Sequence, residues 1–228
     1  MELPKIDTSN LWDKTYNILK ERIIRREFRP NQKLLIPELA EQLGVSRTPI
    51  RDALNRLEMD GLVTTVSKVG TFVNGIEIHD VLDIMDTRMM LEFWVAEKLA
   101  DVPKEELEKE LMVMEAIIQR SLKDIKTLSL KQYLQNDYNM AFHLKFMELG
   151  RNNKNTEIYK NIMNYRFLAA ETSLISEDMI TTAANQHLAI IQSLRDGNVQ
   201  QIKSVIKIHL DDSKERLILK IDKNGGII

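Results

Sequence analysis

Residues 38–63 read ELAEQLGVSRTPIRDALNRLEMDGLV, and this run predicts two helices separated by a tight turn. Pro37 stands at the first turn of the first helix, where its missing N–H costs nothing, and Gly44 ends that helix. Ser46 is a good N-cap for a second helix that runs to about Asp60. Two helices joined by a short turn that contains glycine are typical of a helix-turn-helix, whose second helix enters the major groove of DNA.

The flanking residues extend this unit in both directions. Apolar residues recur at helical spacing over residues 10–27, which predicts a further amphipathic helix. After Gly61 the residues LVTTV alternate as in a strand, SKVG forms a turn with Lys68 near its tip, and TFV returns. We therefore expect a winged helix-turn-helix domain over residues 1–74.

The first turn of the second helix carries the residues that suit a DNA contact. It presents Ser46, Arg47 and Thr48, and Arg51 follows one turn later on the face of Arg47. Arginine can bridge two acceptors of guanine, while hydroxyls and a helix N-terminus suit phosphates. The alternative is a small helical domain whose arginines are only solvated. The turn, the paired arginines and the wing together favour DNA binding.

The rest of the chain is predicted to be an antiparallel bundle of helices. Between Ile76 and Asn224 only Pro103, Gly150 and Gly197 interrupt the sequence. The fold class is thus mainly α, with a linker at residues 75–78 and a helical domain over residues 79–228. The expected helices span residues 79–100, 104–122, 128–149, 154–173, 177–196 and 198–221.

Composition excludes several classes of protein. The 228 residues carry 32 basic and 34 acidic side chains and no cysteine, so disulfides, thiolate metal sites and cysteine nucleophiles are absent. No run approaches the ~20 apolar residues that a spanning helix needs, and the first residues lack a signal-peptide core. We expect a cytoplasmic protein without a membrane partner.

Three histidines lie in helices that we expect to face one another. They are His143, His187 and His209, and Asn139 lies four residues before the first of them, on the same helix face. Such a set would bind one divalent metal, for example Zn, Ni or Mn, and leave positions open for a small anion. The alternative is three ordinary polar histidines.

The front of the chain resembles the GntR family of bacterial winged-helix regulators. The resemblance rests on residues 38–63 and on VGTFV at residues 69–73. It implies that Ser46, Arg47, Thr48 and Arg51 meet operator DNA, with Lys68, Gly70 and Thr71 of the wing near the minor groove. Pro37 stands where members similar to FadR carry arginine, so one operator contact of those members is missing here.

The back of the chain is similar to the helical FCD domain of the FadR subfamily. The matching stretches are NMAFH at residues 139–143, QHLAIIQSLRDGN at residues 186–198, His209, and RMMLE at residues 88–92. The resemblance implies a metal site at Asn139 and the three histidines, although Asn139 replaces the usual aspartate. Arg88 is then either a clamp for an effector carboxylate or the ion-pair partner of Glu92, four residues later.

These features predict a transcription regulator rather than an enzyme. We expect a homodimeric repressor whose affinity for double-stranded operator DNA is controlled by a small organic acid at the metal site. One alternative is a metal-free regulator with a larger apolar effector, as FadR takes acyl-CoA. A helical metal-dependent hydrolase or lyase is disfavoured, because no HExxH, paired-carboxylate or Ser-His motif is present.

Overall fold

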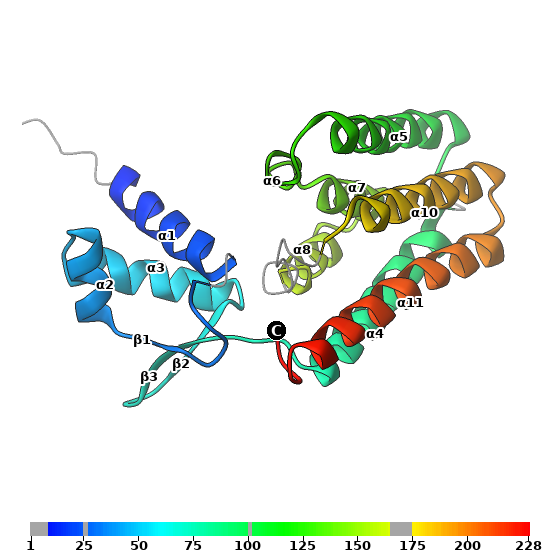
Figure 1. The fold of residues 1–228 in the computed structure, drawn as a ribbon. Coiled ribbons are helices and arrows are strands. Elements are labelled where there is room, and N and C mark those ends of the chain that lie inside the picture. Colours follow the sequence, from blue (N-terminus) through cyan, green and yellow to red (C-terminus); the bar gives the residue numbers. More distant parts are fainter. Residues whose placement is uncertain (1–8, 25–26, 100–101, 165–174) are drawn as a thin grey trace, which may run out of the picture. The chain divides into compact units, whose positions relative to one another are not determined.

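The structure is a computed structural model that describes residues 9–24, 27–99, 102–164 and 175–228 (Figure 1). The chain divides into two compact units. The first unit contains the described residues up to Ile76 together with Asn164, Ile227 and Ile228, and the second contains residues 77–163 and 175–226. The division at residue 76 lies inside the predicted linker.

Three helices form the body of the first unit. They are α1 (Ser9–Ile24), α2 (Ile36–Leu43) and α3 (Arg47–Met59). Helix α1 packs against α3, and Ile23, Ile50 and Leu57 are fully buried between and beside these helices. Helix α2 ends at Gly44, whose φ of 63° is left-handed, a conformation that glycine adopts without strain. The predicted helix-turn-helix is confirmed.

The wing is a small antiparallel sheet with the strand order β1-β3-β2. The hairpin of β2 (Val63–Val66) and β3 (Gly70–Val73) was expected, and Val63 pairs with Val73. Strand β1 (Lys33–Leu34) pairs with the other edge of β3. The sequence predicted only a turn there, because two residues are too few to show the alternation of a strand.

The second unit is entirely helical among its described residues. Its helices are α4 (Ile78–Lys98), α5 (Lys104–Thr127), α6 (Leu130–Tyr133), α7 (Tyr138–Leu149), α8 (Asn153–Ile162), α10 (Glu177–Asp196) and α11 (Val199–Lys223). Helix α4 packs against α11, α7 and α8, while α10 packs against α5 and α11. None of the helices in the described ranges is long and apolar enough to cross a membrane.

Several predicted helix boundaries are wrong. The helix expected over residues 128–149 is broken into α6 and α7, because the Asp137 side chain accepts the N–H of Met140 and starts a new helix. Helix α1 is described up to Ile24, and residues 25 and 26 of the expected helix lie outside the described part, whereas α5 continues to Thr127. Helix α8 ends at Ile162, and residues 165–173 of the expected helix lie outside the described part.

The end of the sequence packs within the first unit. The N–H of Ile76 donates to the carbonyl of Ile228 at 2.6 Å, and the N–H of Ile228 donates back at 3.0 Å. A Cβ atom on Gly75 would lie 2.4 Å from Cδ1 of Ile227, so a side chain at this position would displace that of Ile227. The residues that follow α11 therefore join the segment that precedes α4, a contact that no sequence pattern indicated.

Candidate functional site

The exposed face of α3 presents the residues predicted to contact DNA. Ser46, Arg47, Thr48 and Arg51 are all exposed, and within the described ranges neither arginine takes part in an ion pair. Ser46 occupies the predicted N-cap position, although its side chain accepts no capping hydrogen bond. Two unpaired guanidinium groups beside a helix N-terminus are suited to phosphates and base edges.

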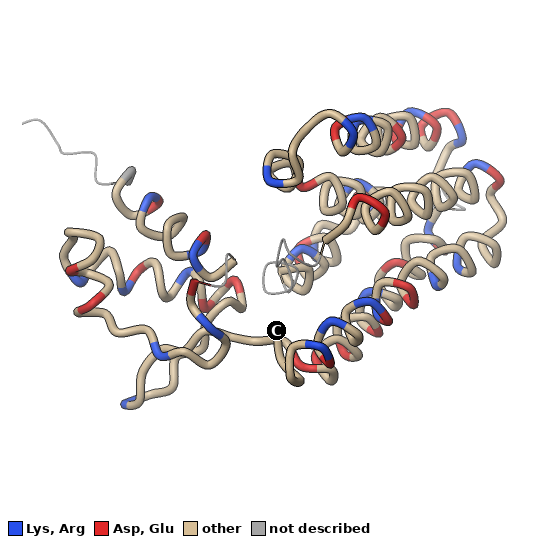
Figure 2. Tube along the Cα trace, in the orientation of Figure 1, with Lys and Arg blue, Asp and Glu red and all other residues tan. Residues whose placement is uncertain are grey.

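Arg56, further along α3, has a different environment. Its Nη1 lies 2.9 Å from Oδ1 of Asp13, and its guanidinium lies 4.1 Å from the centre of the Tyr16 ring. These contacts hold α1 against α3, so Arg56 stabilises the unit. Basic and acidic residues are interspersed along the helices of both units (Figure 2). The candidate DNA face is therefore defined by unpaired arginines and not by a long basic stretch.

The wing residues differ in their exposure. Lys68 is exposed at the tip, in a left-handed conformation with a φ of 62°. Gly70 has a φ of 146°, and a Cβ there would lie 2.5 Å from Cε of Lys33. Thr71 is only 6% exposed, and its hydroxyl bonds that of Thr65 at 3.0 Å. A DNA contact from Thr71 would therefore use its backbone, while Lys68 is free to approach a groove.

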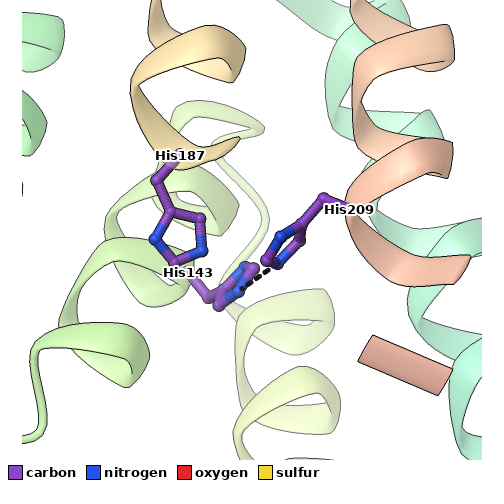
Figure 3. Close-up of side chains that lie close together, drawn as sticks. All are labelled: His143, His187 and His209. Atoms are coloured by element: carbon purple, nitrogen blue, oxygen red, sulfur yellow. Dashed lines mark hydrogen bonds between the residues drawn. The ribbon is translucent and has the colours of Figure 1, made fainter. Parts of the chain in front are cut away.

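The three predicted histidines converge in the core of the second unit (Figure 3). His143 comes from α7, His187 from α10 and His209 from α11, and one nitrogen of each lies within 4.8 Å of the others. All three are buried, and burial lowers their pKa values; the pKa of His187 falls to about 3. The rings are therefore neutral at physiological pH, the form that binds a metal.

Some ring nitrogens of this cluster are buried without a hydrogen-bond partner among the described residues, and this indicates whether the cluster suits a metal. Nδ1 of His143 and both ring nitrogens of His187 have no hydrogen-bond partner among the described residues. Buried polar atoms are nearly always satisfied, so these nitrogens call for an explanation. Nε2 of His143 lies 3.4 Å from Nε2 of His209, and two nitrogen ligands of one tetrahedral Zn²⁺ lie about 3.4 Å apart. The cluster fits a divalent metal.

Hydrogen bonds behind His209 determine which of its nitrogens faces the cluster. Nε2 of Gln186 donates to Oδ2 of Asp212 at 2.8 Å, so Oε1 of Gln186 faces Nδ1 of His209, also at 2.8 Å. Because an amide oxygen only accepts, Nδ1 carries the proton and Nε2 presents a lone pair. Metal-binding histidines usually donate their second ring N–H in this way.

Arg88 lies behind His143 and forms a buried ion pair. Its Nη2 lies 3.1 Å from Oε1 of Glu92 and 3.2 Å from Nε2 of His143, and its Nε donates to the Tyr159 hydroxyl at 3.2 Å. Tyr159 donates to Glu92 at 2.6 Å, while burial raises the pKa of Glu92. The structure thus contains the ion pair that was the alternative to a carboxylate clamp, and the clamp stays a prediction.

We expect Arg88→Met to lower the free energy of unfolding of the metal-free protein by about 3–5 kcal/mol, because it leaves the Glu92 carboxylate buried without its cation. The double variant Arg88→Met/Glu92→Leu removes both charges and should recover most of this loss. Urea denaturation of the two variants measures the difference. Unchanged stability in Arg88→Met would mean that the guanidinium is not needed by the core and is available to an effector.

A cavity of about 300 Å³ lies beside the histidines. Its described lining includes His187, His209 and Asn139, which is exposed, and it also includes Arg216. Arg88 is not among these residues. Arg216 was missed by sequence reasoning, although it follows His209 by seven residues and so lies on the same face of α11 two turns later. The remaining described lining residues are Ile118, Ser121, Tyr133, Leu134, Asn136, Asp137, Tyr138, Ile175, Met179, Ile180, Ala183, Ala184 and Ser213.

The fold and the site define a DNA-binding regulator with a helical effector domain. Comparison with known families agrees: residues 11–73 match the gntR family of bacterial regulatory proteins, and residues 83–212 match the FCD domain. The chain belongs to the GntR family of bacterial transcription regulators and carries an FCD domain. Its relatives are transcription regulators, which confirms the prediction that it is not an enzyme.

Similar proteins cover nearly the whole chain. YdhC of Bacillus subtilis, an uncharacterised HTH-type transcriptional regulator, is 26% identical over 89% of this chain and 88% of its own length. The Nta operon transcriptional regulator of Aminobacter aminovorans is 27% identical over 84% of this chain and 87% of its own length. LutR of B. subtilis is 26% identical over 87% of this chain and 97% of its own length.

Solved structures support the fold. Lar, which controls expression of the Listeria monocytogenes agr system, has a TM-score of 0.68 at 21% identity and covers 95% of this chain and 98% of its own. A GntR regulator from Rhodococcus sp. RHA1 has a TM-score of 0.64 at 20% identity and covers 92% and 98%. At these identities the likeness shows the fold alone.

Proposed function

We propose that this regulator binds its operator as a two-fold homodimer and that a small organic acid, bound beside a divalent metal at His143, His187 and His209, controls its affinity for DNA. The observation that carries this proposal is the set of buried, unpartnered imidazole nitrogens next to a cavity. Asn139, which lines the same cavity, is the proposed fourth ligand. A metal bound there would add positive charge beside the cavity, which favours an anionic effector.

The dimer is proposed because one recognition helix, α3, contacts only a short stretch of DNA. A single helix in the major groove contacts few base pairs, and helix-turn-helix proteins gain specificity from two half-sites about 34 Å apart. Residues 1–74 carry 12 basic and 10 acidic side chains, so charge alone would hold one copy weakly on DNA. A change in the arrangement of the two recognition helices would then change the affinity for the operator.

The size of the cavity favours a small effector over an acyl-CoA. Small-molecule pockets span about 300–1,000 Å³, and this cavity lies at the lower limit of that range. The apolar side chains in its lining, Met179 and Ile180 among them, are the observation that favours the metal-free alternative. Metal analysis of the purified protein separates the two.

The test begins with DNA that the full-length protein selects from a random pool. Its affinity for the protein is then measured at fixed salt, with chelator, with Zn²⁺, and with Zn²⁺ plus acids that shift the melting temperature. We expect one class of carboxylic acid to change operator affinity by about 5- to 150-fold, the usual range of coupling between sites. Operator affinity that responds to neither metal nor acid contradicts the proposal.

A further inference from the structure

Arg216 is the one lysine or arginine among the described residues that line the cavity. Its side chain is 25% exposed, and its Nη1 lies 2.6 Å from Oδ2 of Asp212, one turn earlier on α11. A guanidinium has five N–H donors, so donors remain for a second carboxylate after this contact. Arginine binds carboxylates through two parallel hydrogen bonds, which makes Arg216 a ready anion site in a cavity whose other lining is mostly apolar or hydroxylic.

The partner of Arg216 is also the anchor of His209. The same Asp212 oxygen that faces Arg216 accepts a hydrogen bond from Gln186 at 2.8 Å, and Gln186 in turn holds Nδ1 of His209. Four side chains are therefore joined in one chain of polar contacts from the cavity to the candidate metal centre. A ligand carboxylate that binds Arg216 competes with Asp212 for the guanidinium. A shift of Asp212 changes its hydrogen bond with the side-chain amide of Gln186, and through Gln186 it changes the orientation of the His209 ring.

We propose that Arg216 binds the effector's carboxylate and that Asp212 and Gln186 transmit this binding to His209. The inference rests on the proposed function, because His209 is one of the proposed metal ligands. Arg216 is the specificity-determining residue of the cavity in this scheme, and Asp212 and Gln186 are positioning residues. Arg88 remains in its buried pair with Glu92.

The cavity also limits the body of the acid. A volume of about 300 Å³ lies at the lower limit for small-molecule pockets, so the cavity suits an acid with a small body. Ile118, Met179, Ile180 and Ala184 form an apolar wall for a hydrocarbon or aromatic body, and the hydroxyls of Ser121 and Ser213 lie in the same lining. The ligand class is thus a small monocarboxylic acid with an apolar body. Benzoate has this size and charge, and benzamide is its neutral counterpart.

The first experiment measures binding of benzoate and benzamide to the full-length protein by calorimetry, with and without Zn²⁺. We expect Arg216→Met to weaken benzoate binding by about 10- to 100-fold, the loss typical of a hydrogen bond to a charged group, and to leave benzamide unchanged. Lys214→Met is the matched control, because Lys214 lies on the same helix in an ion pair with Asp211 and does not line the cavity. Equal benzoate affinity in wild type and Arg216→Met, or no binding of benzoate to wild type, overturns the assignment.

The second experiment tests the connection to His209 with the metal alone as probe. We expect Asp212→Asn and Gln186→Met to lower Zn²⁺ affinity by about 10- to 100-fold in competition with a chelator, as loss of a hydrogen-bond partner behind a ligand does. The ¹⁵N spectrum of His209 in metal-free protein should show the proton on Nδ1 in wild type and lose this preference in Gln186→Met. Unchanged affinity and an unchanged spectrum contradict the positioning roles.

A third measurement separates transmission from direct contact. Saturating benzoate should change the Zn²⁺ affinity of wild type, and Zn²⁺ should change benzoate affinity by the same factor. We expect this coupling to fall in Asp212→Asn, whereas coupling that persists there would show that the acid acts on the metal directly. If no metal binds at all, the proposed function fails, yet the dependence of benzoate binding on Arg216 can still be read in the metal-free protein.

Discussion

Zn²⁺ at about a thousand times its dissociation constant is expected to stabilise this protein by about 4 kcal/mol, since it binds the folded cluster and not the unfolded chain. For a helical unit of about 150 residues this corresponds to a rise of about 10 °C in melting temperature. His187→Leu should abolish the rise. The measurement is a thermal melt of chelator-treated protein with and without Zn²⁺.

The choice of His187 makes this result specific. Neither of its ring nitrogens has a hydrogen-bond partner among the described residues, and its ring stacks on Phe142 at 4.0 Å. A leucine of similar volume therefore removes a ligand without breaking a hydrogen bond, so the metal-free variant should melt near wild type. His79→Ala is the control, because His79 is a 69% exposed histidine away from the cluster and its loss should leave the rise intact.

A substitution at Asn139 is expected to strengthen metal binding in the same experiment. Asn139→Asp adds a negatively charged oxygen to the cavity lining and should tighten Zn²⁺ binding if residue 139 is a ligand. A wild-type protein that gains no stability from Zn²⁺, Ni²⁺ or Mn²⁺ contradicts the metal site as a whole. A site that binds metal but ignores Asn139→Asp removes only Asn139 from the ligand set.

The sequence predicted the helices whose ends are marked by local chemistry. Helix α2 ends at Gly44 and α10 ends at Gly197, both in left-handed conformations that glycine accepts, and both ends were expected. The convergence of His143, His187 and His209 was also predicted, because each lies on the buried stripe of a long helix. Apolar periodicity and helix caps depend on residues close together in the sequence, so they can be recognised in one sequence.

The missed features depend on contacts between distant residues. Strand β1 exists because β3 offers a free edge, and its two residues show no pattern of their own. The buried pair of Arg88 and Glu92 is visible in sequence as a spacing of four, but only packing decides between an ion pair and an open clamp. Arg216 follows Asp212 by four residues on α11, but the hydrogen bond from Gln186 on α10 to Asp212 joins two helices, and no spacing within either helix reveals it.

Arg47→Ala and Arg51→Ala are each expected to remove most of the specific affinity for the operator. An arginine that bridges two acceptors of a guanine contributes about 1–3 kcal/mol of discrimination. In a two-fold dimer each substitution acts at both half-sites, so the loss is about 2–6 kcal/mol, or roughly 30-fold to 25,000-fold. Both side chains are exposed, so the melting temperature should stay within about 1–2 °C of wild type, as surface substitutions rarely change stability.

Two further variants separate base reading from general attraction to DNA. Arg151→Ala removes a guanidinium of the helical unit whose side chain is 58% exposed, and it should leave operator affinity unchanged. Lys68→Ala at the wing tip should weaken operator and scrambled duplexes alike and reduce the salt dependence of binding, because a lysine at a phosphate carries no sequence information. Arg47→Ala and Arg51→Ala should instead weaken the operator far more than the scrambled duplex in fluorescence anisotropy at fixed salt. An operator bound by either arginine variant as tightly as by wild type would place that arginine outside the interface, even with the fold and the family unchanged.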